Sequence, residues 1–201
     1  MAESIKIEVF RKKLPDELTK ALSEKDSRTD IGSGAALTAA SACAYFIRAA
    51  ALAAEEYGSS ERLEYMLRNG EILRGYMINL IDEDVKCRGP LRKASRDGDE
   101  RTLEASRQTA AAIANEIVNM MHQLLELLDE LTDCSLSSGR RFAASAADLA
   151  LGAVHACQRY LLEFASLSSD DTYRFIVRRE NEITLEACEA RCRSVLKKTG
   201  Y

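Results

Sequence analysis

The sequence contains few of the residues that interrupt helices. Only 2 prolines and 10 glycines occur among 201 residues, and tryptophan is absent. This scarcity permits long helices. Apolar positions recur at three- and four-residue spacing almost everywhere, and no segment sustains the alternation of a strand. We therefore predict an all-α protein, a single antiparallel multihelical bundle domain of about six helices over residues 1–201.

The chain also lacks the excess of positive charge that a nucleic-acid-binding surface requires. It has 28 Lys and Arg against 32 Asp and Glu, a formal net charge of -4 and a pI near 5.4. The most apolar stretch, 35–54, is broken by Arg48, and the first residues do not form a signal-peptide core. We expect a cytoplasmic protein with no nucleic-acid or membrane partner.

No arrangement typical of a disulfide framework or a metal site is recognisable. Six cysteines occur without an export signal, so we expect reduced thiols. Cys188 and Cys192 share one helical face, but no third or fourth ligand is evident near them. His122 and His155 lie in apolar stretches and are not spaced as a metal-binding pair. We predict neither a metal site nor a cofactor.

Caps and breakers divide the chain into the predicted helices. Pro15 is tolerated in a first turn, so it restarts the first helix, whereas Gly89 and Pro90 are expected to end the third. The predicted ranges are 5–24, 33–57, 60–87, 100–131, a fifth helix that follows 135–139 and ends near 167, and a sixth from the cap at 168–171 to 199.

Two of these helices have a distinctive composition. The second carries 11 alanines between residues 35 and 54, which allow neighbouring backbones to approach closely. The fourth has the periodicity of a buried bundle face, so we place its stripe in the core. The stripe consists of Ile113, Ile117, Met120, Met121, Leu124, Leu127, Leu128 and Leu131.

The alanine-rich helix begins at a break of small residues, Thr29 to Gly34. A helix start offers unpaired backbone N–H groups and the positive end of a dipole, which suit an anionic or polar ligand group. We take Gly32 and Ser33 as candidate ligand-positioning residues, although Ser and Gly are also ordinary helix starters. Asp30 is either a second cap or an acid of the site.

Three successive acids, Asp82, Glu83 and Asp84, occur late in the third predicted helix. Consecutive helical residues lie about 100° apart, so the three cannot share one face. Asp84 is the preferred catalytic acid because it lies near the boundary with the core, and Asp82 is placed behind it. The other interpretation is a solvated acidic patch on a surface helix.

The order of these features resembles the formiminotetrahydrofolate cyclodeaminase and methenyltetrahydrofolate cyclohydrolase family. That family has the pattern F-L-x-x-L-A-S-x-x-P-x-P-G-G-G-S-V-A-A-L near its start. Leu18 to Leu37 follows the pattern without a gap, with Gly32 and Ser33 among the matches. The family's I-D-E-D segment corresponds to Ile81 to Asp84, and 151–167 is similar to the end of its fifth helix.

The resemblance implies an enzyme acting on the one-carbon unit that bridges N5 and N10 of tetrahydrofolate. A cyclodeaminase closes 5-formiminotetrahydrofolate to the methenyl form with loss of ammonia, and a cyclohydrolase adds water to the methenyl carbon. Either reaction needs a base, for which we take Asp84. The folate derivative is the substrate rather than a cofactor. The family also implies a homodimer formed through long apolar helices.

The chain departs from the family at two places. Asp30 and Ile31 replace two glycines of P-G-G-G-S, and Arg140 and Arg141 align with a Ser-Asp pair. Arginines oppose the dipole at a helix start, so an anion is expected nearby. We consider both the glutamate tail of a folate and an ion pair with Asp30 or Asp84.

These departures leave two alternatives to the enzyme open. One is a catalytically divergent or inactive family member that serves as an oligomeric binding or scaffold protein. The other is a helical interaction protein unrelated to folate.

Overall fold

The computed structural model describes residues 15–201 except residues 26, 28 and 135, and within this part the chain forms helices and no strand. The predicted all-α class is therefore confirmed. The helices are α1 (Pro15–Ser23), α2 (Ile31–Tyr57), α3 (Glu61–Asp97), α4 (Glu100–Leu131), α5 (Arg140–Leu167) and α6 (Asp171–Thr199).

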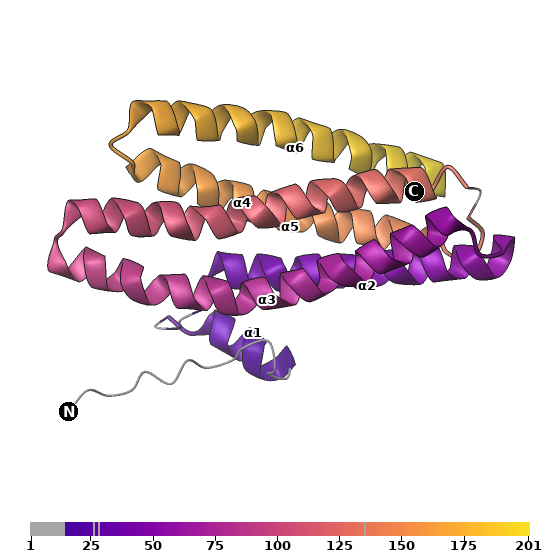
Figure 1. Ribbon diagram of the computed structural model, residues 1–201, viewed down its shortest axis with the longest axis horizontal. Coiled ribbons are helices and arrows are strands. Elements are labelled where there is room, and N and C mark those ends of the chain that lie inside the picture. The colour runs from indigo at the N-terminus through magenta and orange to yellow at the C-terminus, as the bar shows by residue number, and fades with distance from the viewer. Residues whose placement is uncertain (1–14, 26, 28, 135) are drawn as a thin grey trace.

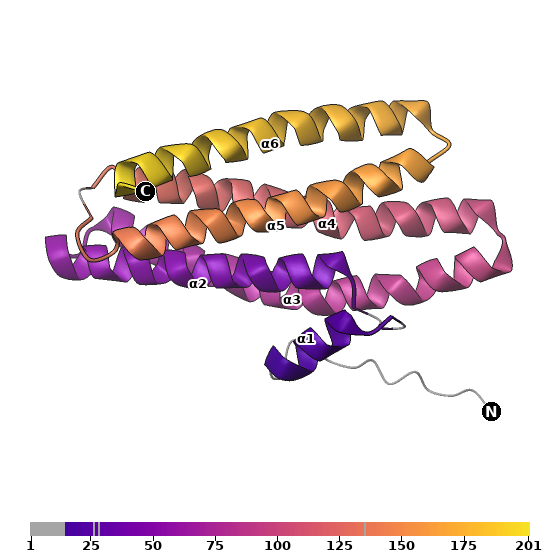
Figure 2. The same cartoon turned by 180° about the vertical axis from the view of Figure 1, so that it is seen from behind.

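The five long helices form an antiparallel bundle (Figures 1 and 2). Helices α4 and α5 contact each other, and α2 and α3 pack on one side of this pair. Helix α6 lies on the other side, against α4 and α5. The short helix α1 lies outside the bundle next to α2 and α3, on the side away from α6 (Figure 2).

The core contains the stripe that the fourth helix was expected to bury. Ile117, Met121, Leu124 and Leu128 are fully buried, and Met120 and Leu127 pack partly against the core. The small side chains of α2 let this helix pack closely against α3 and α5. By length and composition α2 also resembles a membrane span, but half of its most apolar window is buried inside the protein. A buried core helix meets the same criteria of length and apolar composition.

The helix ends follow the predicted caps at most places. The Ser60 hydroxyl accepts a hydrogen bond from the Leu63 N–H at 3.2 Å, and the Asp170 carboxylate accepts bonds from the N–H groups of Thr172 and Tyr173. Gly98 ends α3 in the left-handed region, at φ 70°, which glycine adopts without steric cost. The observed ranges of α4, α5 and α6 agree with those predicted.

One expected helix end differs from the structure, and one expected helix start falls on residues that the structure does not describe. Helix α3 does not stop at Gly89 and Pro90 but continues to Asp97. Pro90 is exposed, whereas Arg88 before it and Ala94 after it are buried, so packing on both sides of the proline keeps the helix continuous. For the first helix, α1 begins at Pro15, and the predicted part from 5 to 14 lies outside the described residues.

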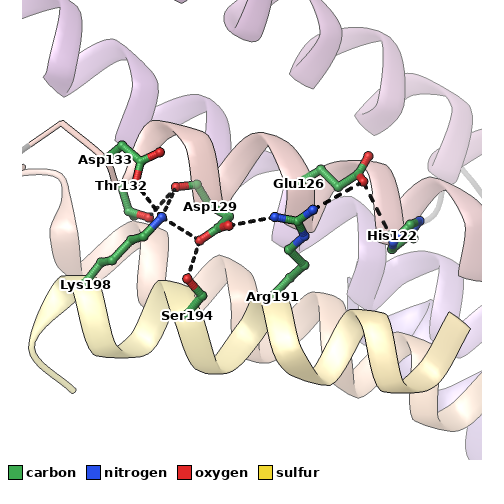
Figure 3. A network of polar contacts seen from close by, with 8 residues as sticks. All are labelled: His122, Glu126, Asp129, Thr132, Asp133, Arg191, Ser194 and Lys198. Carbon is green, nitrogen blue, oxygen red and sulfur yellow. Dashed lines mark hydrogen bonds and ion pairs between the residues drawn. The ribbon is translucent and has the colours of Figure 1, made fainter. Parts of the chain in front are cut away.

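A network of polar contacts joins the second half of α6 to α4 (Figure 3). The Asp129 carboxylate accepts hydrogen bonds from Arg191 at 2.9 Å, Ser194 at 2.6 Å and Lys198 at 2.8 Å. Lys198 also pairs with Asp133 at 2.5 Å. Because three basic or hydroxyl donors of α6 converge on one partly buried carboxylate, this half of the helix is firmly positioned.

Candidate functional site

The start of α2 binds a carboxylate supplied by the chain itself. Asp84 of α3 is completely buried, and its Oδ2 accepts hydrogen bonds from the Ser33 N–H at 3.0 Å and the Ser33 hydroxyl at 2.6 Å. Residues 51 positions apart in sequence therefore meet at a helix N-terminus, where N–H groups and the helix dipole stabilise negative charge. The two elements predicted from sequence form one site.

Gly32 makes this close approach possible. A Cβ at position 32 would lie 2.8 Å from the Asp84 Cγ and would collide with Oδ1 as well. Side-chain carbons do not tolerate such separations, so the carboxylate occupies the space that a side chain would need. Gly34, two residues further along α2, has no such constraint, because its Cβ would meet only Leu22 at 3.7 Å.

Arg88, one turn after Asp84 on α3, joins the site on its other side. Its Nη2 lies 3.4 Å from the Asp84 Oδ1, and its Nη1 lies 2.7 Å from the Asp30 Oδ2. The guanidinium also donates a hydrogen bond to the Tyr160 hydroxyl. A buried carboxylate needs a charged partner or several hydrogen bonds, and Asp84 has both.

Asp30 is the most accessible member of the cluster. It is the N-cap residue of α2, with Oδ1 accepting a hydrogen bond from the Ile31 N–H at 2.8 Å. Its side chain is 42% exposed, whereas that of Arg88 is 8% exposed. The cap predicted for Asp30 is therefore present, and its second oxygen connects the buried pair to the surface.

Two uncharged side chains of α5, Tyr160 and Cys157, lie beside the site. Burial raises the pKa of the Tyr160 hydroxyl far above its usual value, the nearby carboxylates adding to the rise and Arg88 opposing it. Burial, together with Asp84, raises the pKa of the Cys157 thiol to about 12. Both groups therefore stay protonated at neutral pH, and neither supplies a negative charge next to Asp84.

The structure separates Asp82 from Asp84. Asp82 is also buried, but it lines a groove of about 680 Å³ between α3 and α4, together with Tyr76, Lys86 and Glu116. Asp84 instead faces the start of α2. Two residues along a helix turn a side chain by about 200°, so the two acids lie on opposite faces of α3. Asp82 is thus not directly behind Asp84.

Arg140 and Arg141 lie at the far end of the bundle from Ser33. Gly139, just before them, lies against Ala49 of α2, so about 24 Å of helix separates their end of the bundle from Ser33. Both arginines are exposed, and the Arg141 guanidinium lies 4.9 Å from the ring centre of Phe142. The ion pair considered between these arginines and Asp30 or Asp84 is absent here, and Arg88 takes that place.

Sequence reasoning missed Arg88 and Tyr160. For Arg88 a signal existed, because Asp and Arg four residues apart on a helix are neighbours, and Asp84 had already been selected. Tyr160 gave no such signal, since its contact with Arg88 depends on how α3 and α5 both pack against α2. Among the described residues, no group of three or more His, Cys, Asp or Glu side chains is arranged to hold a metal ion, and all six cysteines are free thiols.

Comparisons with known proteins agree with this architecture. The family model for formiminotransferase-cyclodeaminase matches residues 15–165, well over half of the chain. The crystal structure of formiminotetrahydrofolate cyclodeaminase from Thermotoga maritima has the same fold, with a TM-score of 0.88 at 20% sequence identity over 94% of this chain and 96% of that chain. No curated protein sequence matches. The chain thus belongs to the formiminotransferase-cyclodeaminase family, whose members act in folate metabolism.

Proposed function

We propose that the protein is a folate one-carbon enzyme that cyclises 5-formiminotetrahydrofolate with loss of ammonia or hydrolyses methenyltetrahydrofolate. The observation that carries the proposal is the buried Asp84 carboxylate, held at the start of α2 by Ser33 and Gly32 inside the segment that matches the family model. The similar Thermotoga structure is that of a formiminotetrahydrofolate cyclodeaminase. The tetrahydrofolate derivative is the substrate, and the reaction requires no cofactor.

In this proposal Asp84 transfers the proton. Ser33 directs both of its donors to Oδ2, which leaves Oδ1, with its longer contact to Arg88, as the oxygen that takes up a proton. For cyclodeamination of the protonated formimino group, N10 bonds to the formimino carbon and its proton passes to Asp84. Asp84 then returns the proton to the amino nitrogen, the carbon–nitrogen bond breaks, ammonia leaves, and the methenyl cation remains.

The substrate reaches this carboxylate from the side of Asp30. Asp30 is the exposed member of the cluster and pairs with Arg88, so we propose that folate binding opens the Asp30–Arg88 pair and uncovers Oδ1. Asp82 lines the groove between α3 and α4, and Arg140 and Arg141 begin α5 beside Ala49, so we do not include these three residues in the site within one chain. We assign the ligand-positioning role to Gly32, Ser33, Asp30 and Arg88.

The test is turnover of each folate derivative by the purified protein, followed by the absorbance of the methenyl form. Asp84→Asn should lower turnover by at least about 10²-fold, the usual effect of losing a general acid–base group. Circular dichroism and melting should show that the variant remains folded. Glu83→Gln is the matched control, because Glu83 is exposed on the next position of α3 and pairs with Lys86.

Asp82→Asn distinguishes the two acids and should change turnover far less than Asp84→Asn does. A wild-type protein that binds reduced folate without converting it would overturn the catalytic proposal in favour of a binding or scaffold role. Full activity of Asp84→Asn would show that the proton-transfer group lies elsewhere.

A further inference from the structure

The Arg88 guanidinium carries a buried donor, Nε, in addition to the contacts described above. The side chain is 8% exposed, with Nη1 2.7 Å from the Asp30 Oδ2 and Nη2 3.4 Å from the Asp84 Oδ1. Within the part of the chain that the structure describes, the buried Nε has no hydrogen-bond partner. Buried N–H groups are normally paired, so this atom is a donor for an acceptor that a ligand brings.

The two carboxylates that contact Arg88 differ in how firmly they are held. Asp84 is completely buried, and Ser33 donates two hydrogen bonds to its Oδ2. The Asp30 side chain is 42% exposed, and its Oδ1 accepts a hydrogen bond from the Ile31 N–H. Rotation of the Asp30 carboxylate releases Oδ2 into water, which solvates the charge, whereas Asp84 cannot reach water in this way. Asp30 is therefore the exchangeable partner of Arg88.

The position of the Asp30 Oδ2 suits a carboxylate from another molecule. It faces a planar guanidinium, whose fork of N–H donors matches the two oxygens of a carboxylate. It also lies at the start of the 27-residue helix α2, where the positive end of the dipole favours an anion. The Tyr160 hydroxyl, which accepts a hydrogen bond from Arg88, is neutral and adds no competing negative charge.

We propose that Arg88 and the start of α2 form a binding site for a small free carboxylate, of which formate is the simplest, and that Asp30 competes for this site from within the chain. Arg88 lies 3.4 Å from the Asp84 Oδ1, so the bound carboxylate lies beside the group assigned to proton transfer. The glutamate carboxylates of a folate are separated from the reacting carbon by an aminobenzoyl ring, which places them further away. A small carboxylate therefore competes with the folate, a consequence that rests on the proposed function.

The test measures the affinity of the full chain for formate, by titration with sodium formate at an ionic strength held constant with sodium chloride. Asp30→Asn removes the competing charge and keeps the helix cap, because asparagine caps as well as aspartate. The variant should bind formate at least about tenfold more tightly than the wild type, the factor expected when one competing hydrogen bond between charged groups is lost. Equal affinities would overturn the proposal.

Asp170→Asn is the matched control for charge. Asp170 caps α6 by accepting hydrogen bonds from the N–H groups of Thr172 and Tyr173, at a different helix start. This variant should have the formate affinity of the wild type. An equal gain in both variants would show that formate responds only to the net charge of the protein, and the proposal would be wrong.

The Nε–H resonance of Arg88 in nitrogen-edited NMR spectra reports on the site directly. It should move on addition of formate, in the wild type as well as in Asp30→Asn, and should saturate with the affinity that the titration gives. A resonance that stays fixed while formate binds would place formate elsewhere and overturn the proposal. The wild-type spectrum gives this answer without any variant.

Tetrahydropteroate, which lacks the glutamate of tetrahydrofolate, separates a small free carboxylate from the glutamate tail. Formate should weaken the binding of both compounds. If Asp30→Asn tightens the binding of tetrahydrofolate alone, and not that of formate, the site belongs to the glutamate tail and the proposal fails. Absence of folate turnover would contradict the proposed function but not the carboxylate site, because the formate titrations contain no folate.

Discussion

Gly32→Ala is the most direct perturbation of the contact between α2 and α3. The new Cβ would lie 2.8 Å from the Asp84 Cγ and would collide with Oδ1, so the carboxylate must move. Moving it weakens the two hydrogen bonds from Ser33 and the ion pair with Arg88. Because Asp84 has no exposed surface, water cannot replace these partners.

The expected cost combines three contributions. Overpacking costs about 1–3 kcal/mol, and a buried polar group left unsatisfied costs about 1–3 kcal/mol more. Alanine returns up to about 1 kcal/mol through its higher helix propensity. Gly32→Ala should therefore lower the free energy of unfolding by about 1–6 kcal/mol, measured as a shift in the urea midpoint at unchanged slope.

Gly34→Ala provides the control on the same helix turn. Its Cβ would make ordinary contacts with Leu22 at 3.7 and 3.8 Å, so the variant should be neutral or more stable by up to about 1 kcal/mol. In an Asp84→Ala background the effect of Gly32→Ala should nearly vanish, since nothing remains to collide with. Equal effects of Gly32→Ala and Gly34→Ala, or no coupling to Asp84, would refute the reasoning.

Two further predictions concern the core and the α4–α6 network. Leu124→Asp should unfold the protein, because Leu124 is fully buried and an unpaired charge there costs several kcal/mol; an unchanged melting temperature would contradict the assignment of the stripe to the core. Partial burial acts to raise the pKa of Asp129, but hydrogen bonds from Lys198, Ser194 and Arg191 hold it below its usual value. The stability that Asp129 contributes is therefore complete above pH about 4 and is lost as pH falls through the lower folded-state pKa. Asp129→Asn should have a lower melting temperature than the wild type at neutral pH. Below pH about 4 its melting temperature should fall less steeply than that of the wild type, because the variant has no carboxylate to protonate at position 129. A fall as steep as that of the wild type would count against the network.

Most helix limits could be predicted because caps and periodicity agree at those places. Helix α4 was predicted as 100–131 since Asp99 supplies a cap and the apolar stripe ends at Leu131, and both features act locally. The extent of α3 could not be predicted in this way. Pro90 breaks a helix only where its lost hydrogen bond and ring cannot be accommodated, and its exposed position depends on how the whole helix packs.

The site was predictable in its members but not in its contacts. Ser33 and Asp84 were selected separately, and their direct hydrogen bonds follow from the packing of α2 on α3. The predicted free N–H groups of the helix start are in part already bonded, because Asp84 fills the place expected for a ligand. Of the two anionic partners considered for Arg140 and Arg141, the ion pair with Asp30 or Asp84 is not formed, since these arginines begin a helix whose start lies beside Ala49.

The three motif positions that carry glycine in the family, here 30 to 32, are not equivalent in the structure. Asp30 caps α2 and Ile31 is 41% exposed, and neither needs a positive φ, so side chains are accommodated at both. Gly32 alone lies against Asp84, where a Cβ cannot fit. Replacement of the first two glycines therefore leaves the approach of Asp84 to the helix start intact. It also adds the Asp30 carboxylate, which gives Arg88 a second anionic partner at the surface edge of the cluster.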